Sequence, residues 1–275
     1  MAHVIALANH KGGASKTTSV ANLGAAFAME PLNKRVLLID ADPQANLSTI
    51  FGCDPELIGM RLEDALERPS WDDAPAAWRT RPVPGQEPVE LAAGVHVLPC
   101  TEELEVVVRS EAQAEGFAHR LRNLVALYDG SYDIILIDTP PGRQALSTLA
   151  LLAAHYVIAP IRPADLDVEG AIRLTEMLED EIEQHNPSIK MLGVLVTQTD
   201  RRWKIGGAAR NALKEAQIAT FEREVPFAVS VGRAPAYMAP TIVLQPDGRV
   251  GSAYRDVAMG LAEVLDQVTR LEVVS

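Results

Sequence analysis

The chain has 275 residues, of which 48% are hydrophobic and 23% are charged. That is enough apolar material for one large α/β domain. No apolar run approaches the roughly 20 residues of a membrane-spanning helix, and the first residues lack the pattern of a signal peptide. The two cysteines, Cys53 and Cys100, stand outside any C-x-x-C pattern, which argues against a disulfide framework or a thiolate metal site. We therefore expect a cytoplasmic protein.

Charge is distributed unevenly along the chain. The formal net charge is −12, which taken alone argues against a nucleic-acid partner. Residues 200–256, however, hold nine Lys/Arg and six Asp/Glu, whereas the remainder holds 16 basic and 31 acidic residues. The last third of the chain thus differs electrostatically from the rest.

Apolar segments rich in Val, Ile and Leu alternate with helix-compatible segments. The expected strands cover residues 4–8, 36–39, 95–98, 134–137, 156–159 and 191–196. The expected helices cover residues 17–29, 104–128, 143–153, 167–185, 206–219 and 251–269, the last with Ala253, Val257, Leu261, Val264 and Leu265 along one face. Continuous apolar strands are typical of a parallel sheet covered on both faces. The alternation predicts an α/β fold, a doubly wound and mostly parallel sheet with helices on both faces.

Residues 68–94 break this pattern. They contain five prolines, Trp71 and Trp78, with little periodicity. Because strands resume on both sides, we expect a surface insertion within a single domain spanning residues 1–275, in preference to an independent linker. The first expected strand begins near His3, so we expect no helix-turn-helix domain before it.

A glycine-containing loop follows the first expected strand and leads directly into a helix. It reads Asn9-His10-Lys11-Gly12-Gly13-Ala14-Ser15-Lys16-Thr17-Thr18. Gly12 and Gly13 allow the backbone to approach an anion closely, and the amides of the loop and of the helix N-terminus then point at that anion. Lys16 is placed to contact β- and γ-phosphates, Thr17 to bind Mg²⁺ and Thr18 to reach the α-phosphate. The pattern predicts a triphosphate site.

The loop does not match the ordinary pattern G-x-x-x-x-G-K-[ST], because His10 and Ser15 stand where its glycines would be. It matches the deviant pattern K-G-G-x-x-K-[ST]-[ST], and here the sequence resembles the ParA/MinD family of P-loop ATPases. The family usually has K-G-G-x-G-K-T-T, so Ser15 is a departure. Its side chain is expected close to the β-phosphate, which bears on the rate of hydrolysis more than on binding.

Two further segments are similar to motifs of this family. Asp40-Ala41-Asp42-Pro43-Gln44-Ala45-Asn46 ends the second expected strand and resembles the switch I segment D-x-D-P-Q-x-N. The resemblance implies that Asp42 orients the attacking water and that Asp40 supports Mg²⁺ through water. Asp138 closes the apolar run 132–138 and looks like a Walker B carboxylate, which holds the water shell of the metal.

Lys11 is the additional lysine at the head of the loop. In the resembling family, this lysine reaches across a nucleotide sandwich dimer to the phosphates of the other subunit. The resemblance implies that Lys11 supplies transition-state charge only when two subunits meet, as an arginine finger does.

The resemblance implies a full set of site residues. The nucleotide-binding residues are Lys11, Gly12, Gly13, Ala14, Ser15, Lys16, Thr17, Thr18, Asp138 and Pro226. The catalytic residues are Lys11, Lys16 and Asp42, and the metal ligands are Thr17, Asp40 and Asp138, with the two aspartates acting through water. Pro226 enters because the segment 225–227 resembles the region that lines the adenine pocket. The usual polar residue two positions later is Ala228 here, so base contacts are expected mostly from the backbone.

Three functions are the alternatives for such an ATPase. A ParA-type (Soj-like) partition ATPase forms an ATP dimer, binds double-stranded DNA without sequence preference and hydrolyses ATP when a ParB-type partner stimulates it. A MinD-like ATPase, which positions cell division or another assembly at the membrane, ends in a basic amphipathic helix. Residues 266–275 hold one basic residue and two acids, a poor anchor. An iron protein similar to that of nitrogenase needs thiolate ligands that Cys53 and Cys100 do not supply.

We therefore expect a Mg²⁺-dependent partition ATPase that is weak on its own, associates with the nucleoid and serves a chromosome, a plasmid or a protein cargo. Binding to DNA phosphates requires a basic surface. The candidate DNA contacts are Arg201, Arg202, Lys204 and Arg210. A solvated helix face is the alternative interpretation of these residues.

Overall fold

The computed structural model describes residues 1–53, 60–67, 95–142, 145–163, 165–200 and 207–274. The insertion predicted at residues 68–94 lies outside the described residues. Six parallel strands form one sheet in the order β3-β2-β4-β1-β5-β6. The strands are β1 (His3–Leu7), β2 (Val36–Asp40), β3 (Val95–Leu98), β4 (Ile134–Asp138), β5 (Tyr156–Ile161) and β6 (Lys190–Val196). All six were expected, and the parallel sheet is confirmed.

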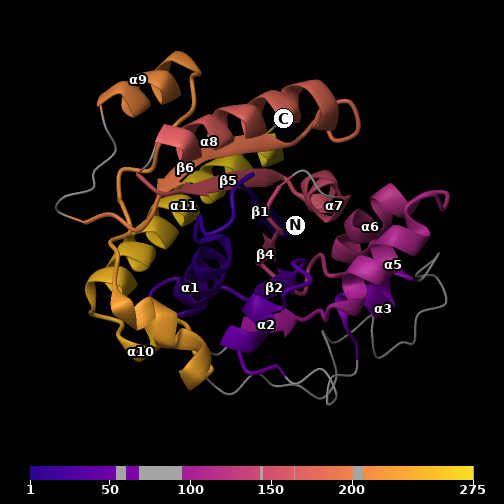
Figure 1. Ribbon diagram of the computed structural model, residues 1–275, viewed down its shortest axis with the longest axis horizontal. Coiled ribbons are helices and arrows are strands. Elements are labelled where there is room, and N and C mark those ends of the chain that lie inside the picture. The colour runs from indigo at the N-terminus through magenta and orange to yellow at the C-terminus, as the bar shows by residue number, and fades with distance from the viewer. Residues whose placement is uncertain (54–59, 68–94, 143–144, 164, 201–206, 275) are drawn as a thin grey trace.

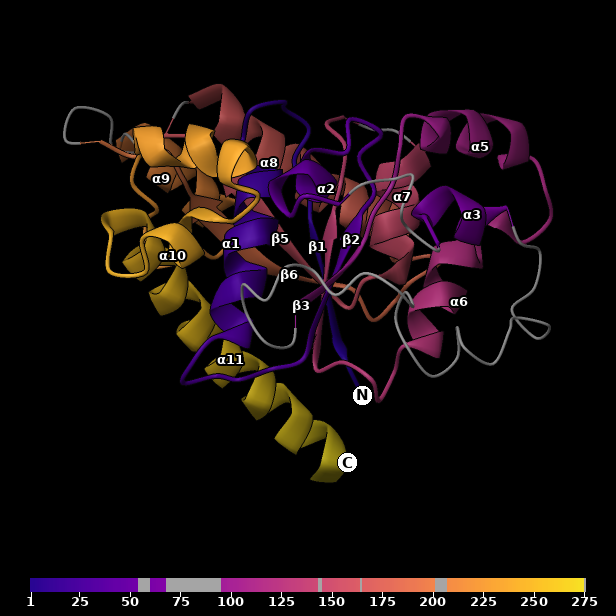
Figure 2. The ribbon, with the colours of Figure 1, turned by 90° about the horizontal axis from the view of Figure 1, so that it is seen from below.

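Helices cover both faces of the sheet, as Figures 1 and 2 show. One layer contains α1 (Lys16–Ala28), α2 (Asn46–Ile50), α10 (Thr241–Leu244) and α11 (Arg249–Val274). The other contains α3 (Leu62–Leu66), α5 (Glu103–Glu111), η1 (Phe117–His119), α6 (Arg120–Leu127), α7 (Ala145–Ala153), α8 (Asp165–Met177) with its π-helical extension η2 (Leu178–Ile182), and α9 (Gly207–Glu215). A 3₁₀ segment, η3 (Val229–Tyr237), precedes α10. This is the α/β architecture expected for a P-loop ATPase.

Each layer of helices buries its own core against the sheet. Successive side chains of a strand point to opposite faces, so in β1 Ile5 and Leu7 pack into the core under α1 and α11. Val4 and Ala6 pack into the core under α5, α6, α7 and α8. Both faces are therefore apolar, which explains the uninterrupted hydrophobic runs. Within the described residues, no helix combines the length and the hydrophobicity needed to cross a bilayer.

Three expectations about helices were wrong. The single helix predicted for residues 104–128 is divided into α5, η1 and α6, because Gly116 adopts a left-handed conformation (φ 73°). Helices α2, α3 and α10 have only four or five residues, too few for a clear periodic pattern, and were not predicted, nor was the 3₁₀ segment η3, which contains Pro235. Val264 does not lie on the buried face of α11, since it is 44% exposed, and Tyr254 and Ala258 complete that face instead.

The contact between α1 and β2 depends on Gly24. A Cβ atom at this position would lie 2.6 Å from Cδ2 of the fully buried Leu38. We expect Gly24→Val to lower the free energy of unfolding by about 1–3 kcal/mol, because it overpacks the core. Gly260 of α11 is exposed with no neighbour within 4 Å of such an atom, so Gly260→Ala is the control, expected to be neutral or stabilising by up to about 1 kcal/mol. Denaturant unfolding measures both, and equal stability of the two variants would contradict the packing argument.

Candidate functional site

The register of the strands brings the predicted site residues together at the carboxyl edge of the sheet. Leu7, the last residue of β1, pairs with Asp138 of β4, and Asp138 pairs with Asp40 of β2. Neighbouring strands lie about 4.8 Å apart, so Asp138 lies beside the start of the loop at residues 8–15, and Asp40 is adjacent to Asp138 on the next strand. The Thr139 hydroxyl donates to the Leu7 carbonyl (2.8 Å) and fixes this junction. Ligands of open α/β sheets bind at this edge.

The phosphate loop at residues 9–15 has a constrained backbone. Gly13 (φ 75°) and Ser15 (φ 65°) both adopt left-handed conformations. For a non-glycine residue such a conformation costs on the order of 1–3 kcal/mol, so Ser15 needs compensating contacts. Asn9 anchors the start of the loop, because its buried side chain donates to the Pro160 carbonyl (2.6 Å) and accepts from the Lys11 amide (3.1 Å). The amides at the start of α1, which begins at Lys16, then face the space enclosed by the loop.

The two loop lysines occupy separate places. The Lys16 ammonium is buried and donates to the Lys11 carbonyl (3.3 Å). Burial lowers the pKa of Lys16, and the charges of Asp138 and Asp42 partly oppose this shift. The Lys11 side chain is 36% exposed, and its ammonium lies 3.3 Å from Oδ1 of Asp167 in α8. Only Lys16 is therefore directed into its own loop.

Asp167 holds two cations at the rim of the site. It accepts hydrogen bonds from the Arg162 guanidinium (Nε 2.8 Å) and from the Arg162 amide (3.1 Å) and lies beside Lys11. Burial opposes ionisation of Asp167, but the hydrogen bonds from Arg162 and Lys11 outweigh it, so the pKa of Asp167 is lowered. Gly13 lies next to this group, since a Cβ added to it would come within 3.9 Å of Arg162. An anion at the loop would therefore meet a positive rim.

Three carboxylates are buried opposite Lys16. Asp40 accepts hydrogen bonds from the amide (2.8 Å) and hydroxyl (2.7 Å) of Ser48, and Asp42 accepts one from the Gln44 amide (3.0 Å). Burial, together with Asp42, raises the pKa of Asp40 to about 6 despite these hydrogen bonds. The pKa of Asp138 is raised well above its usual range, first by burial and then by Asp40. The ionised cluster is therefore unfavourable without a compensating cation.

These residues fit a hard divalent cation. Neither oxygen of Asp138 accepts a hydrogen bond of normal geometry from the described residues, although both are buried. The Thr17 hydroxyl is close enough to lower the pKa of that carboxyl. Hydroxyl, carboxylate and water oxygens are the ligands that Mg²⁺ prefers. The donor set therefore matches the ion expected from the sequence.

A pocket of about 350 Å³ adjoins the phosphate loop. It is lined by Ser15, Thr18, Thr197, Gln198, Val225, Pro226, Phe227, Ala228, Val229, Val231, Gly232 and Tyr254. Its size and mostly apolar lining suit a purine base. The predicted Pro226 is one of the residues that line it. We refer to it as the base pocket.

On the far side of Pro226 lies a second hollow, which we call the arginine notch. Its lining residues are Thr199, Arg210, Glu222, Arg223, Glu224, Pro226, Arg249 and Ala253. Arg210 pairs with Glu224 (3.2 Å) and Arg223 with Asp256 (3.0 Å), whereas no acidic residue in the described ranges pairs with Arg249. Of the predicted DNA contacts, Arg210 is 60% exposed, and Arg201, Arg202 and Lys204 lie outside the described residues.

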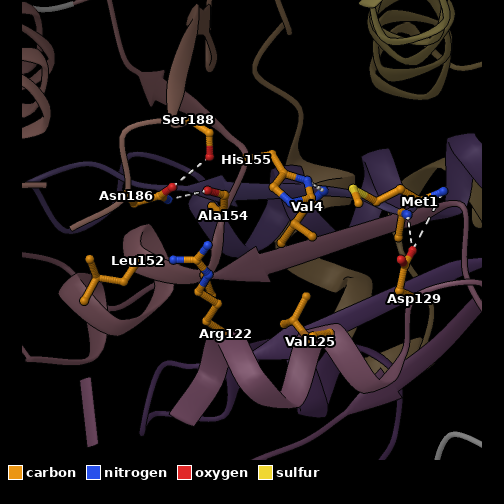
Figure 3. Close-up of a pocket in the computed structure, with 13 residues that line it drawn as sticks. Met1, Val4, Arg122, Val125, Asp129, Leu152, Ala154, His155, Asn186 and Ser188 are labelled. Carbon is orange, nitrogen blue, oxygen red and sulfur yellow. Dashed lines mark hydrogen bonds and ion pairs between the residues drawn. The ribbon is translucent and has the colours of Figure 1, made fainter. Parts of the chain in front are cut away.

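Another pocket lies at the opposite, amino edge of the sheet (Figure 3). Apart from the exposed Arg122, its polar side chains bond to one another or to the backbone. Asn186 donates to the carbonyls of Leu151 and Ala154, and His155 accepts from the amide of Val4. These contacts tie the starts of β1, β5 and β6 together, so this pocket is structural and is not the candidate site.

Sequence reasoning missed Asn9, Arg162, Asp167 and Gln198. Arg162 directly follows the last residue of β5, and a polar residue at the end of a buried strand was a usable signal. Gln198 likewise follows a buried strand, β6, but its contact with the loop, like that of Asp167, depends on how the end of β6 and α8 approach the loop.

The buried carboxylate of Asp138, which lies beside that of Asp40, is expected to destabilise the ligand-free protein. Asp138→Asn removes a buried charge that burial and Asp40 disfavour. We expect the melting temperature of the ligand-free protein to rise by about 2–4 °C for each kcal/mol gained, while the stabilisation by Mg²⁺ with nucleotide is lost. Differential scanning calorimetry with Mg²⁺ or with a chelator measures both effects. Glu105→Gln, at a 65% exposed position of α5, is the control. A lower melting temperature of ligand-free Asp138→Asn would contradict the argument.

Comparison with known proteins agrees with this geometry. A family model described as an AAA domain matches residues 2–191. The chromosome-partitioning ATPase Soj of Thermus thermophilus is 33% identical over 255 residues, covering 92% of this chain and 93% of that protein. The chromosome partitioning protein ParA of Caulobacter vibrioides is 32% identical over 260 residues, covering 93% and 92%.

Solved structures share the whole fold. Cobyrinic acid a,c-diamide synthase of Mycobacterium smegmatis, with bound ADP and magnesium, superimposes with a TM-score of 0.74 and 28% identity, covering 97% of this chain and 96% of that one. MinD of Pyrococcus horikoshii, complexed with Mg-ADP, has a TM-score of 0.74 at 22% identity, covering 96% and 98%, and shows the fold alone. The chain therefore belongs to the ParA/MinD family of P-loop ATPases, and within that family to the ParA type.

Proposed function

We propose that this protein is a DNA partition ATPase that binds Mg-ATP, forms a nucleotide sandwich dimer and binds DNA without sequence preference. A ParB-type partner stimulates hydrolysis, which is slow in its absence. The observation that carries the proposal is the placement of Lys11. Its ammonium lies at the partly exposed rim of the site, while Lys16 occupies the interior of the loop.

Different site residues bind the phosphates, the base and the metal ion of Mg-ATP. The loop amides and Lys16 neutralise the phosphates, and Pro226 packs against the base. Thr17, Asp40 and Asp138 hold Mg²⁺, the aspartates through water, and the bound ion supplies charge for the triphosphate. Asp42, which is 8% exposed and adjoins this cluster, orients the attacking water. Within the monomer, Asp167 retains Lys11, so the charge needed for rapid turnover comes from a second subunit.

DNA binding is assigned to the surface around the arginine notch. Exposed arginines bind phosphates without reading bases, and Arg210, Arg223 and Arg249 converge there. A dimer doubles this surface. Because salt screens charges beyond about 8 Å, the local basic surface outweighs the net charge of −12 at close range.

The central test measures binding of duplex DNA with ATP, with ADP and without nucleotide at increasing salt. We expect binding that requires ATP, weakens steeply with salt and is equal for unrelated sequences. Vesicles of anionic lipid serve as the competing ligand. Binding to lipid in place of DNA would replace the partition function with a MinD-like one.

Lys11→Ala tests the sandwich dimer. We expect ATP binding to persist, because Lys16 and the loop amides remain, and ATP-dependent dimerisation to be lost. Turnover should fall by roughly 10³-fold or more, as for loss of an arginine finger. Asp167 keeps its bonds to Arg162, so the fold should be retained. Light scattering and phosphate release measure these effects, with the exposed Lys190→Ala as control. Normal ATP-dependent dimers of Lys11→Ala would refute the role in trans.

Arg249→Ala tests the DNA surface. Because no described acid neutralises Arg249, its charge is available to phosphate. We expect affinity for all duplexes to fall equally and the slope of log K against log salt to decrease by about 1 for each arginine engaged. Arg173→Ala, on α8 and 67% exposed, is the control. An unchanged slope of log K against log salt for Arg249→Ala would show that DNA binds to another surface.

A further inference from the structure

Gln198 connects the phosphate loop to a segment 185 residues away in the sequence. Its Nε2 atom lies 3.0 Å from the Gly13 carbonyl oxygen and 2.7 Å from the Ser15 hydroxyl. The carbonyl can only accept, so the amide group facing the loop is the NH₂. One side chain therefore holds two positions of the loop.

The backbone around Gln198 is itself fixed. Gln198 follows β6 in a left-handed conformation (φ 56°). On one side the Thr197 amide donates to the Ile161 carbonyl (2.7 Å), and on the other the Thr199 amide donates to the Val225 carbonyl (3.1 Å). Both anchors belong to the sheet and its parallel extension, so Gln198 acts on the loop from a rigid support.

The bond to Gly13 orients an amide of the loop. The Gly13–Ala14 peptide is trans, since the one cis bond in the described chain is Glu30–Pro31, and in a planar trans peptide the C=O and the following N–H point in opposite directions. With its C=O directed to Gln198, this peptide directs the Ala14 N–H to the other side of the loop. Ala14 is 1% exposed, and no described residue accepts a hydrogen bond from that N–H. A bound anion would satisfy this otherwise unpartnered donor.

We propose that Gln198 is a positioning residue that sets the phosphate loop before nucleotide binds, and that Ser15 provides its second point of attachment. The inference rests on the proposed nucleotide binding at this loop. Donors that are oriented in advance need no reorganisation when the ligand arrives. The hydroxyl of Ser15 is thereby directed to Gln198, which also compensates the left-handed conformation of Ser15.

The test uses Gln198→Glu, which keeps the shape of the side chain but cannot donate to the Gly13 carbonyl when ionised. We expect the affinity for ADP, measured by calorimetry, to fall at least about 10-fold, while the ligand-free protein keeps a single cooperative thermal transition. Gln198→Ala should lower the affinity for ADP by a smaller factor, because it places no negative charge beside the loop. Gln217 is also left-handed (φ 55°) but exposed and away from the loop, so Gln217→Glu is the matched control.

Two further readouts separate positioning from other roles. Gln198 also lines the base pocket, so ADP and inosine diphosphate are compared. If Gln198 is a positioning residue, its substitution lowers the affinities for ADP and inosine diphosphate by the same factor. A changed ratio of the two affinities would show base recognition and overturn the inference. In a double-mutant cycle, Ser15→Ala and Gln198→Ala should be less than additive. Additive losses, or normal affinity of Gln198→Glu, would also overturn it. Failure of the unaltered protein to bind ADP or ATP would instead refute the proposed function itself.

Discussion

Three carboxylates and one ammonium share a space that is nearly closed to water, and the rest of the site is arranged around this constraint. Asp40 and Asp138 are adjacent because β2 and β4 pair in register, so their repulsion is built into the sheet. Lys16 offsets part of it and is itself disfavoured by burial. The ligand-free site is therefore electrostatically incomplete, and a triphosphate alone would add negative charge to it. When nucleotide binds together with a divalent cation, the cation offsets both the repulsion between the carboxylates and the negative charge of the triphosphate.

Much of the fold could be predicted because each strand is a continuous apolar run, and the parallel sheet follows from alternation with helices. The prediction of one helix at residues 104–128 was wrong, because Gly116 adopts a left-handed conformation that interrupts the helix within an amphipathic pattern. The prediction that Val264 lies on the buried face of α11 was wrong, because the spacing of apolar residues does not identify which of them faces the sheet.

The site was predictable where it is local in sequence. Lys16, Thr17 and Asp138 stand in or directly after regular elements, and the register places them together. The contacts of Lys11 with Asp167 and of Ser15 with Gln198 join residues more than 150 positions apart. No periodicity or spacing encodes such contacts. They depend on the direction in which each loop leaves the sheet, which packing alone determines.

Pro226 borders the base pocket on one side and the arginine notch on the other, and its neighbours are hydrogen-bonded to Thr199. A ligand that shifts this shared wall from one side alters the free energy of binding on the other, and linkage requires the effect to be mutual. If ATP raises the affinity for DNA by some factor, as the proposed function requires, bound DNA raises the affinity for ATP by that same factor. Under the proposed function, DNA is therefore an allosteric effector of nucleotide binding as well as the surface to which the protein binds.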